Sequence, residues 1–278
     1  MSSRKVPAWL SGALVLGAFG ALCRLERRRP LRRETESKLA RSARNLAFAG
    51  VSAVVLGLTE RPVADRLTAL VERRRVGLLK RARLPGRLEV ATAVVLLDYT
   101  LYAWHVLTHR VAWLWRFHVV HHVDLDLDAT TALRFHFAEL ALSVPWRAAQ
   151  ILVIGVSPLS FSIWQTLLML SILFHHSNVR LEPGLERRLN LLIVTPRMHG
   201  IHHSTVRAQT DSNWSSGLSV WDRLHGTLRL NVPRGEVEIG VPAYREPREV
   251  GLTKILAMPF GAERPAWEDV RLKTTIES

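Results

Sequence analysis

The sequence predicts an all-α protein that crosses a membrane several times. Hydrophobic residues make up 48% of the 278 residues, while Lys and Arg outnumber Asp and Glu by 38 to 24. Apolar runs separated by basic clusters are typical of membrane proteins, and the basic residues do not interleave with aromatic residues as on nucleic-acid-binding faces. We therefore expect about four to five membrane-crossing segments and no nucleic-acid partner. The apolar segments are roughly 8–23, 46–59, 88–104, 138–156 and 159–174.

The first segment resembles a signal peptide in length, but its flanks predict a retained span. The basic sequence CRLERRRPLRR follows it and outweighs Arg4 and Lys5 before it, which places its C-terminal end in the cytoplasm. The second segment has about 14 residues where a span usually needs about 20. We therefore expect it to be tilted, thin or re-entrant.

The remaining segments leave the orientation open. Residues 60–87 resemble an interfacial amphipathic helix, and Ser157-Pro158 joins the last two segments as a helical hairpin. If all five segments cross, residues 105–137 and 175–278 share the cytoplasmic side with the basic stretch after the first span. Residues 60–87 would then lie outside although they are equally basic, so the positive-inside rule does not settle the topology.

The chain divides into three expected regions. An N-terminal region of membrane spans and a basic interfacial segment covers residues 1–87, a catalytic domain covers 88–258, and a C-terminal tail covers 259–278.

Eight of the twelve histidines fall in three clusters beside the apolar segments. Residues at positions i, i+3 and i+4 share one helix face, so each cluster is expected to point its imidazoles in one direction, as metal binding requires. Cys23 is the single cysteine, which leaves histidine and carboxylate as the ligands. One metal accepts about four such ligands, so this number of imidazoles predicts two metals. The clusters are His105 and His109; His118, His121 and His122; and His199, His202 and His203.

The order of these motifs resembles the fatty acid hydroxylase/sterol desaturase superfamily of membrane di-iron enzymes. The resemblance runs from about residue 88 to 258 and is carried by LLDYTLYAWHVLTH, LWRFHVVHHVDLDLDATTALRFHFAE, FHHSNVRLEP, TPRMHGIHHS and NWSSGLSVWDRLHGTLR. It implies a fan of membrane helices with a cytosolic, histidine-rich helical cap. It also implies oxygen-dependent hydroxylation or desaturation of a lipid carbon.

The resemblance implies a set of metal ligands. His136 is included although Phe137 replaces the proline of the R-x-H-P-x-E pattern, which leaves it as the tenth ligand or as a supporting residue, and His175 is left out because its position is often glutamine. The ligands are His105, His109, His118, His121, His122, His136, His176, His199, His202 and His203.

Four polar residues are candidates for supporting the metal ligands. A metal-bound imidazole usually donates its second N–H to a carboxylate or carbonyl. Asp98 lies two helical turns before His105 within an apolar run, where an ionisable residue usually has a partner. Glu139, Asp222 and Asn213 are further candidates, although each is also suited to capping a helix.

Two classes of function fit these observations. The first is an oxidoreductase of a bacterial inner membrane, with two iron ions facing the cytoplasm and zinc able to replace iron during purification. Because the chain shows no flavin, nicotinamide or iron–sulfur motif, its electrons would come from a ferredoxin- or cytochrome-type reductase system. The second is a non-redox zinc protein or hydrolase, but no box contains the glutamate of H-E-x-x-H. The sequence does not disclose which lipid is the substrate.

Overall fold

The computed structural model describes residues 5–262 and 264–267, and all regular elements in these ranges are helices, as the sequence predicts. The α-helices are α1 (Ala8–Arg28), α2 (Lys38–Leu58), α3 (Glu60–Arg74), α4 (Leu78–Ala82), α5 (Gly86–Arg110), α6 (Ala112–His122), α7 (Phe137–Ile154), α8 (Pro158–His176), α9 (Pro183–Leu189), α10 (Pro196–His202), α11 (Arg207–Thr210), α12 (Val220–Leu224) and α13 (Leu252–Ala257). Short 3₁₀ helices span Thr131–Leu133, Arg234–Glu236, Pro247–Glu249 and Met258–Phe260.

Five helical stretches within the described residues are long and apolar enough to cross a membrane. They match the five segments expected from the sequence, although the helix that matches 138–156 ends at Ile154. The short second segment lies inside α2, which has 21 residues and is therefore about 30 Å long. The first turns of α2 contain basic and polar residues, so a count of apolar residues underestimates the length of the helix.

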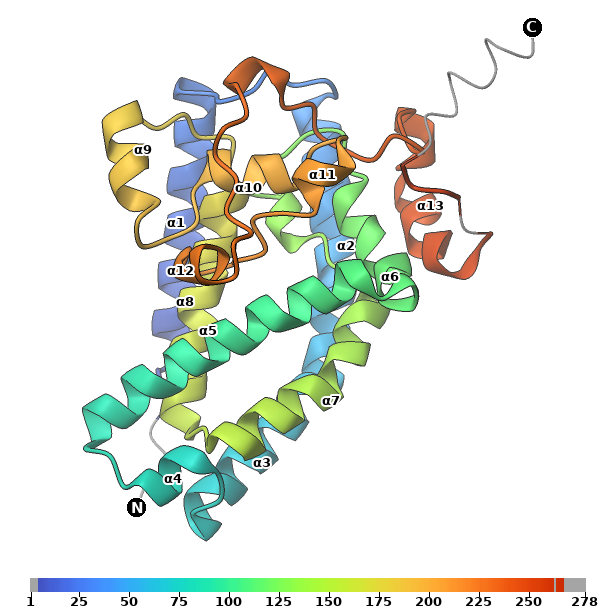
Figure 1. Ribbon diagram of the computed structural model, residues 1–278. Coiled ribbons are helices and arrows are strands. Elements are labelled where there is room, and N and C mark those ends of the chain that lie inside the picture. Colours follow the sequence, from blue (N-terminus) through green and yellow to red (C-terminus); the bar gives the residue numbers. More distant parts are fainter. Residues whose placement is uncertain (1–4, 263, 268–278) are drawn as a thin grey trace, which may run out of the picture.

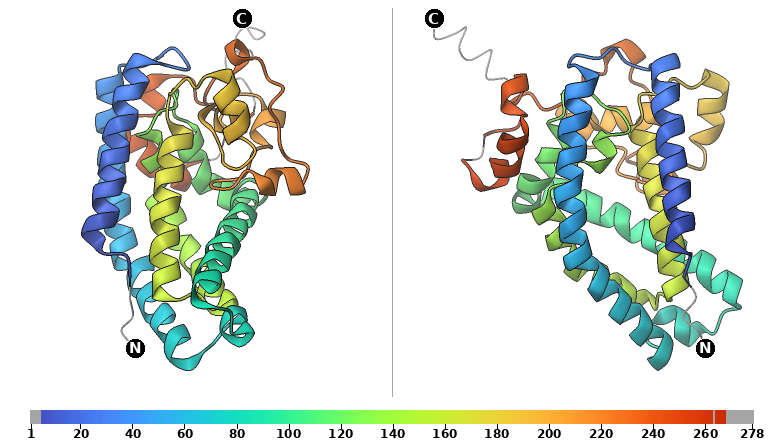
Figure 2. Two further views of the ribbon diagram at one scale, coloured as in Figure 1. Left: turned by 90° about the vertical axis from the view of Figure 1, so that its left-hand side faces the viewer. Right: turned by 180° about the vertical axis from the view of Figure 1, so that it is seen from behind.

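The long helices form an open fan rather than a regular bundle. Figure 1 shows α5 crossing the molecule obliquely, and Figure 2 shows α1 and α2 standing upright on the opposite side. Helix α1 packs on α8, α2 and α3 pack on α7, and α5 packs on both α6 and α8. The expected hairpin of α7 and α8 is wrong in one respect: the two helices share a short turn but diverge from it, and each packs mainly on other helices.

Residues 60–87 differ from the single interfacial helix expected. Helix α3 follows α2 after Thr59, and its buried residues Ala64, Thr68 and Val71 lie on the face that packs against α7. The chain then leaves the helix at Arg75, which has a left-handed conformation, and starts the short α4.

The link between α3 and α4 touches the turn after α7 through two glycines. Both Gly77 and Gly155 have positive φ angles, of 97° and 84°. A Cβ atom on Gly77 would lie 2.3 Å from the Cα atom of Gly155. Only glycine permits this approach of the two backbones.

The variant Gly77→Ala is expected to destabilise the protein, because it adds both a backbone clash and an unfavourable φ. The cost should be at least about 1–3 kcal/mol, the usual range for one strained residue. Thermal unfolding of the purified protein measures this. Gly57→Ala is the matched control, since no atom lies within 4 Å of a Cβ at Gly57 in α2. Equal melting temperatures for the two variants would contradict the contact.

The short helices that follow α8 gather at one end of the fan. Figure 1 shows α9 to α12 above α5 and beside the upper part of α8, at the end where α1 and α8 finish and α2 begins, while α3 and α4 lie at the other end. Helix α10 packs on α8, and α13 packs on α2. All three histidine clusters are at the end with this cap. Whether residues 1–87 form a separate region stays a prediction.

Candidate metal centre

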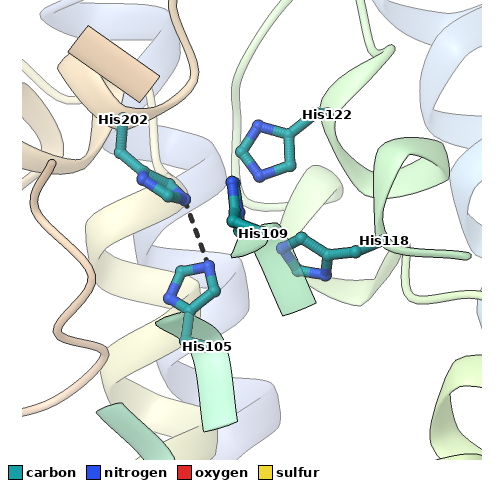
Figure 3. Close-up of side chains that lie close together, drawn as sticks. All are labelled: His105, His109, His118, His122 and His202. Carbon is teal, nitrogen blue, oxygen red and sulfur yellow. Dashed lines mark hydrogen bonds between the residues drawn. The ribbon is translucent and has the colours of Figure 1, made fainter. Parts of the chain in front are cut away.

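Nine of the predicted histidines gather in two groups where α10 of the cap meets α5, α6 and α8. In each group the candidate ligand nitrogens lie within 4.8 Å of one another. The rings of the first group point toward a common centre in Figure 3. The two groups adjoin, because the ring of His122 in the first stacks on that of His203 in the second, with centroids 4.2 Å apart. The first group is His105, His109, His118, His122 and His202, and the second is His121, His176, His199 and His203.

The H-x-x-H-H motifs are divided between the groups, which corrects the expectation that each points in one direction. On α6, His118 and His122 belong to the first group and His121 to the second. An α-helix turns by about 100° per residue, so positions i and i+4 diverge by about 40°, while i+3 and i+4 diverge by about 100°. The motif in α10 is divided in the same way. Each helix therefore serves both groups.

Within the first group, two imidazole nitrogens face each other without a hydrogen atom to share. His105 donates from Nδ1 to the carbonyl oxygen of Trp214 at 2.6 Å, and His202 donates from Nδ1 to that of Ser212 at 2.8 Å. A carbonyl only accepts hydrogen bonds, so in each neutral ring Nε2 carries a lone pair. These two Nε2 atoms lie 3.1 Å apart, where their lone pairs repel each other unless a cation lies against both.

The second group repeats this arrangement. His121 faces the carbonyl oxygen of Arg134 at 3.3 Å and His176 faces that of Ile172 at 2.8 Å, in both cases through Nδ1. Their Nε2 atoms are 2.9 Å apart. Nε2 of His176 also lies 3.1 Å from Nε2 of His199, so a third imidazole nitrogen approaches the same point.

Protonation of the rings does not relieve this repulsion near neutral pH. Burial lowers the pKa of His202 to about 3 and holds the pKa of His121 and His203 well below the usual value for histidine. An imidazolium is therefore disfavoured near neutral pH. In addition, the Nε2 atoms of His109, His118 and His122 are buried without a hydrogen-bond partner.

One metal ion in each group would satisfy these nitrogens. Nitrogen ligands about 2.0–2.1 Å from one ion lie roughly 2.8–3.0 Å from their neighbours in octahedral geometry and roughly 3.3–3.4 Å apart in tetrahedral geometry, and the Nε2 separations of 2.9–3.1 Å fall within this span. Among the described residues both groups contain only histidine, a donor that suits iron, zinc and copper more than magnesium or calcium. The residues present therefore fit two transition-metal ions.

His136 and His175 lie outside both groups. Nδ1 of His136 accepts from the backbone N–H of Ala138 at 3.1 Å, and its Nε2 donates to the carbonyl oxygen of Leu256 at 3.2 Å. A single neutral tautomer satisfies both bonds, so His136 caps α7 and needs no metal. The sequence placed His136 among the ligands, but the structure does not bring it to them. The ring of His175 packs 4.1 Å from that of His199.

Comparison with known proteins identifies a family for the part of the chain that contains both histidine groups. Residues 90–227 match the sequence model of the family described as fatty acid hydroxylase. This region of the chain belongs to the fatty acid hydroxylase family. No solved structure gives a significant match.

The relatives of this fatty acid hydroxylase family member act on lipids according to their names. Ornithine lipid hydroxylase OlsE of Rhizobium tropici is 33% identical over 178 residues, which cover 63% of this chain and 51% of that protein. Human alkylglycerol monooxygenase is 28% identical over 131 residues, covering 47% and 28%. Mouse cholesterol 25-hydroxylase is 28% identical over 142 residues, covering 50% and 46%. The matches thus span about half of these relatives or less.

The four polar residues expected to support the metal ligands lie at different distances from the histidines. Glu139 contacts a candidate ligand directly, since its Oε1 lies 2.8 Å from Nδ1 of His118. Asp222 accepts from the backbone N–H of Trp214 at 2.8 Å and so holds the peptide chain whose carbonyl orients His105. These two contacts support the expectation of carboxylates behind the ligands.

Asp98 and Asn213 do not contact the histidines but hold the backbone segments beside them. Asp98 accepts from the backbone N–H of Leu218 at 3.0 Å and from Nε1 of Trp221 at 2.7 Å, and it does not contact the histidine two turns along its helix. Asn213 donates to the carbonyl oxygen of Met198 at 2.9 Å and has a φ of 57°. Both residues fix the segment 212–222, whose carbonyls orient His105 and His202.

A buried ionic network that the sequence analysis missed lies behind the second group. Asp124 accepts from Arg41 at 3.1 Å and from Asn45 at 2.9 Å. Burial alone would raise the pKa of Asp124, but Arg41 and Arg134 lower it to about 2. Arg134 also donates to Asn45 at 3.2 Å, and its carbonyl orients His121. The D-L-D-L-D sequence after the second motif places three acids at alternating positions. This pattern could have indicated the network.

Proposed function

We propose that this protein is a membrane-bound monooxygenase that uses two iron ions to hydroxylate a lipid. The observation that carries the proposal is the pair of buried, adjoining, all-histidine groups whose Nε2 lone pairs face one another. The first group would hold one ion and the second the other. The relatives named as lipid hydroxylases and monooxygenases favour hydroxylation over desaturation, and iron over the zinc of a hydrolase.

The bound iron would supply the activation of dioxygen, and the chain's own residues would prepare the site for it. The carbonyl oxygens of Trp214, Ser212 and Ile172 fix three imidazoles in the tautomer that leaves Nε2 free. Burial keeps the rings neutral and excludes water, which protects reactive chemistry from side reactions.

The reaction needs an external supply of electrons. Hydroxylation converts one C–H bond to C–OH with one atom of dioxygen, while two electrons and two protons reduce the other atom to water. We expect a ferredoxin- or cytochrome-type reductase system to provide these electrons from the cytoplasm. The lipid would reach the site from the bilayer, because the histidines stand at the ends of apolar helices.

The direct test combines metal analysis with lipid analysis. Purified protein made with sufficient iron should hold close to two metals per chain. With a competent reductant and isotopically labelled dioxygen, a membrane lipid should gain one oxygen atom carrying the label. One tightly bound zinc without iron-dependent turnover, or an altered polar metabolite with no altered lipid, would contradict the proposal.

The cap and the metal centre should face the cytoplasm of a bacterial inner membrane. Arg188 in α9 belongs to the cap, while Arg81 in α4 lies at the other end of the fan, and both are exposed. In a Cys23→Ser background, an impermeant thiol reagent on spheroplasts should label Arg81→Cys at once and Arg188→Cys only after permeabilisation. The reverse pattern would show that the metal centre faces outward.

Glu139→Ala is expected to weaken metal binding by about 10–100-fold, because His118 loses the carboxylate that orients it. Chelator titration of the purified variant measures this. Glu139→Gln should be milder, since the amide oxygen still accepts from Nδ1 of His118. If both variants kept the metal affinity of the parent protein, Glu139 would have no supporting role.

A further inference from the structure

A cavity of about 550 Å³ opens directly beside the first histidine group. It lies between the end of α5, the start of α6, α11 and the segment 264–267. Its volume falls within the roughly 300–1,000 Å³ that is usual for small-molecule sites. The residues that matter most for its chemistry are His109, Arg110, Trp115, Arg207, Asp211 and Arg264.

The cationic part of the cavity lies close to the candidate metal ligands. Arg110 follows His109 in the chain, and its guanidinium carbon lies 5.9 Å from the centre of the Trp214 ring. That ring is in turn 4.5 Å from the ring of His109. One aromatic ring therefore separates a positive charge from the first group.

The charges that line the cavity do not cancel. Among the described lining residues, three arginines stand with one aspartate. Asp211 lies 3.4 Å from Arg110 and 3.9 Å from Arg207, so it balances one of them. Arg264 pairs with Glu249, which lies outside the lining. Even with both pairs formed, one cation remains, and arginine suits carboxylate and phosphate groups.

Two tryptophans line the part of the cavity next to His109. The ring of Trp115 packs 4.8 Å from that of His109 and stacks on Trp267 at 5.9 Å. Arg116 donates to the carbonyl oxygens of Pro259 and Gly261, which ties the segment that precedes Trp267 to α6. The side chains of Arg110, Arg207 and Arg264 are 56%, 69% and 48% exposed, whereas Trp115 and Trp267 are half-buried. A ligand here would therefore meet arginine on the solvent side and an indole ring next to His109, which is the pattern an amphiphile requires.

We propose that this cavity binds the anionic head group of an amphiphilic substrate, either a carboxylate or a phosphate. Because only the Trp214 ring separates the Arg110 guanidinium from the first group, the carbon that is oxidised lies within a few bonds of that head group rather than far along the chain. The second statement rests on the proposed function, whereas the first concerns binding alone.

Photocrosslinking tests the binding on the full-length protein in nanodiscs. The probes are three photoreactive single-chain amphiphiles of equal chain length, namely a carboxylate, a phosphate monoester and an alcohol. One or both anionic probes should label peptides that line the cavity and bind about fivefold or more tightly than the alcohol. Arg207→Gln should weaken anionic binding by about fivefold, and Asp211→Asn should strengthen it, because it frees the arginines.

Arg188→Gln is the matched control, since it removes an exposed arginine from α9 without touching the cavity. It should leave the binding of all three probes unchanged. Equal binding of the alcohol and the anions, or Arg207→Gln and Arg188→Gln variants that behave alike, would overturn the head-group site. The relative labelling by the two anions identifies the group that is preferred.

Fragmentation of the oxidised product by mass spectrometry tests the position of attack. The new oxygen should lie next to the anionic head group or a few bonds from it. An oxygen far along the chain would overturn this inference and leave the proposed function intact. Anionic binding without any oxygenation would instead contradict the proposed function and leave the head-group site standing.

Discussion

Replacing His202 with Ala is expected to lower turnover by more than about 100-fold and to reduce the metal content from two ions toward one. The loss of a residue that merely supports a ligand costs about 10–100-fold, and the loss of a ligand should cost more. The first group would lose the nitrogen that faces His105 at 3.1 Å, while the second group keeps all of its members. Metal analysis and turnover on the same preparation measure both effects.

Two comparison variants make this result specific. His203→Ala should also abolish turnover, but it removes a member of the second group, so the remaining ion should be held by the first. His225→Ala should be much milder, because His225 stacks on Tyr102 outside both groups, with centroids 5.0 Å apart. Full activity and full metal content in His202→Ala would show that the histidine assignment is wrong.

The helices and most of the histidines could be predicted because their signals are local. An apolar run long enough to cross a bilayer is visible in any window of the sequence. A spacing of three or four residues places histidines on neighbouring helix faces wherever the helix goes. Membership of His105 and His109 in one group follows from this spacing alone.

The division of the motifs between two groups needed the third dimension. Spacing shows that His121 and His122 point about 100° apart. It does not show that other helices supply histidines next to each of them. His136 illustrates the same limit. Its sequence context resembles that of a ligand, whereas contacts with Ala138 and the distant Leu256 decide that both of its nitrogens are already used.

The ionic network was hidden for a similar reason. An acid-rich loop and a basic helix start are each unremarkable in a sequence, since charges usually lie in water. They matter here because the fold brings α2 against the loop after α6 and buries both. Asp124 and Arg41 are each only 1% exposed, although 83 residues separate them along the chain.

Replacing Asp124 with Asn is expected to destabilise the protein by about 3–5 kcal/mol, the usual cost of leaving a buried charge without its partner. Arg41 would keep its contact with Asp128, but Arg134, which is 0% exposed, would lose its nearest carboxylate. Because the carbonyl of Arg134 orients His121, the second group should also hold its metal more weakly. Thermal unfolding and chelator titration measure the two effects.

Asp65→Asn provides the control for this change. Asp65 pairs with Lys5 at 2.7 Å, but both side chains are more than 40% exposed, and an exposed ion pair contributes about 0–1 kcal/mol. Its loss should leave the melting temperature and the metal affinity nearly unchanged. If the two variants lost equal stability, burial would not be what makes the Asp124 network important. If Asp124→Asn lost stability but kept its metal affinity, the network would support the fold without positioning His121.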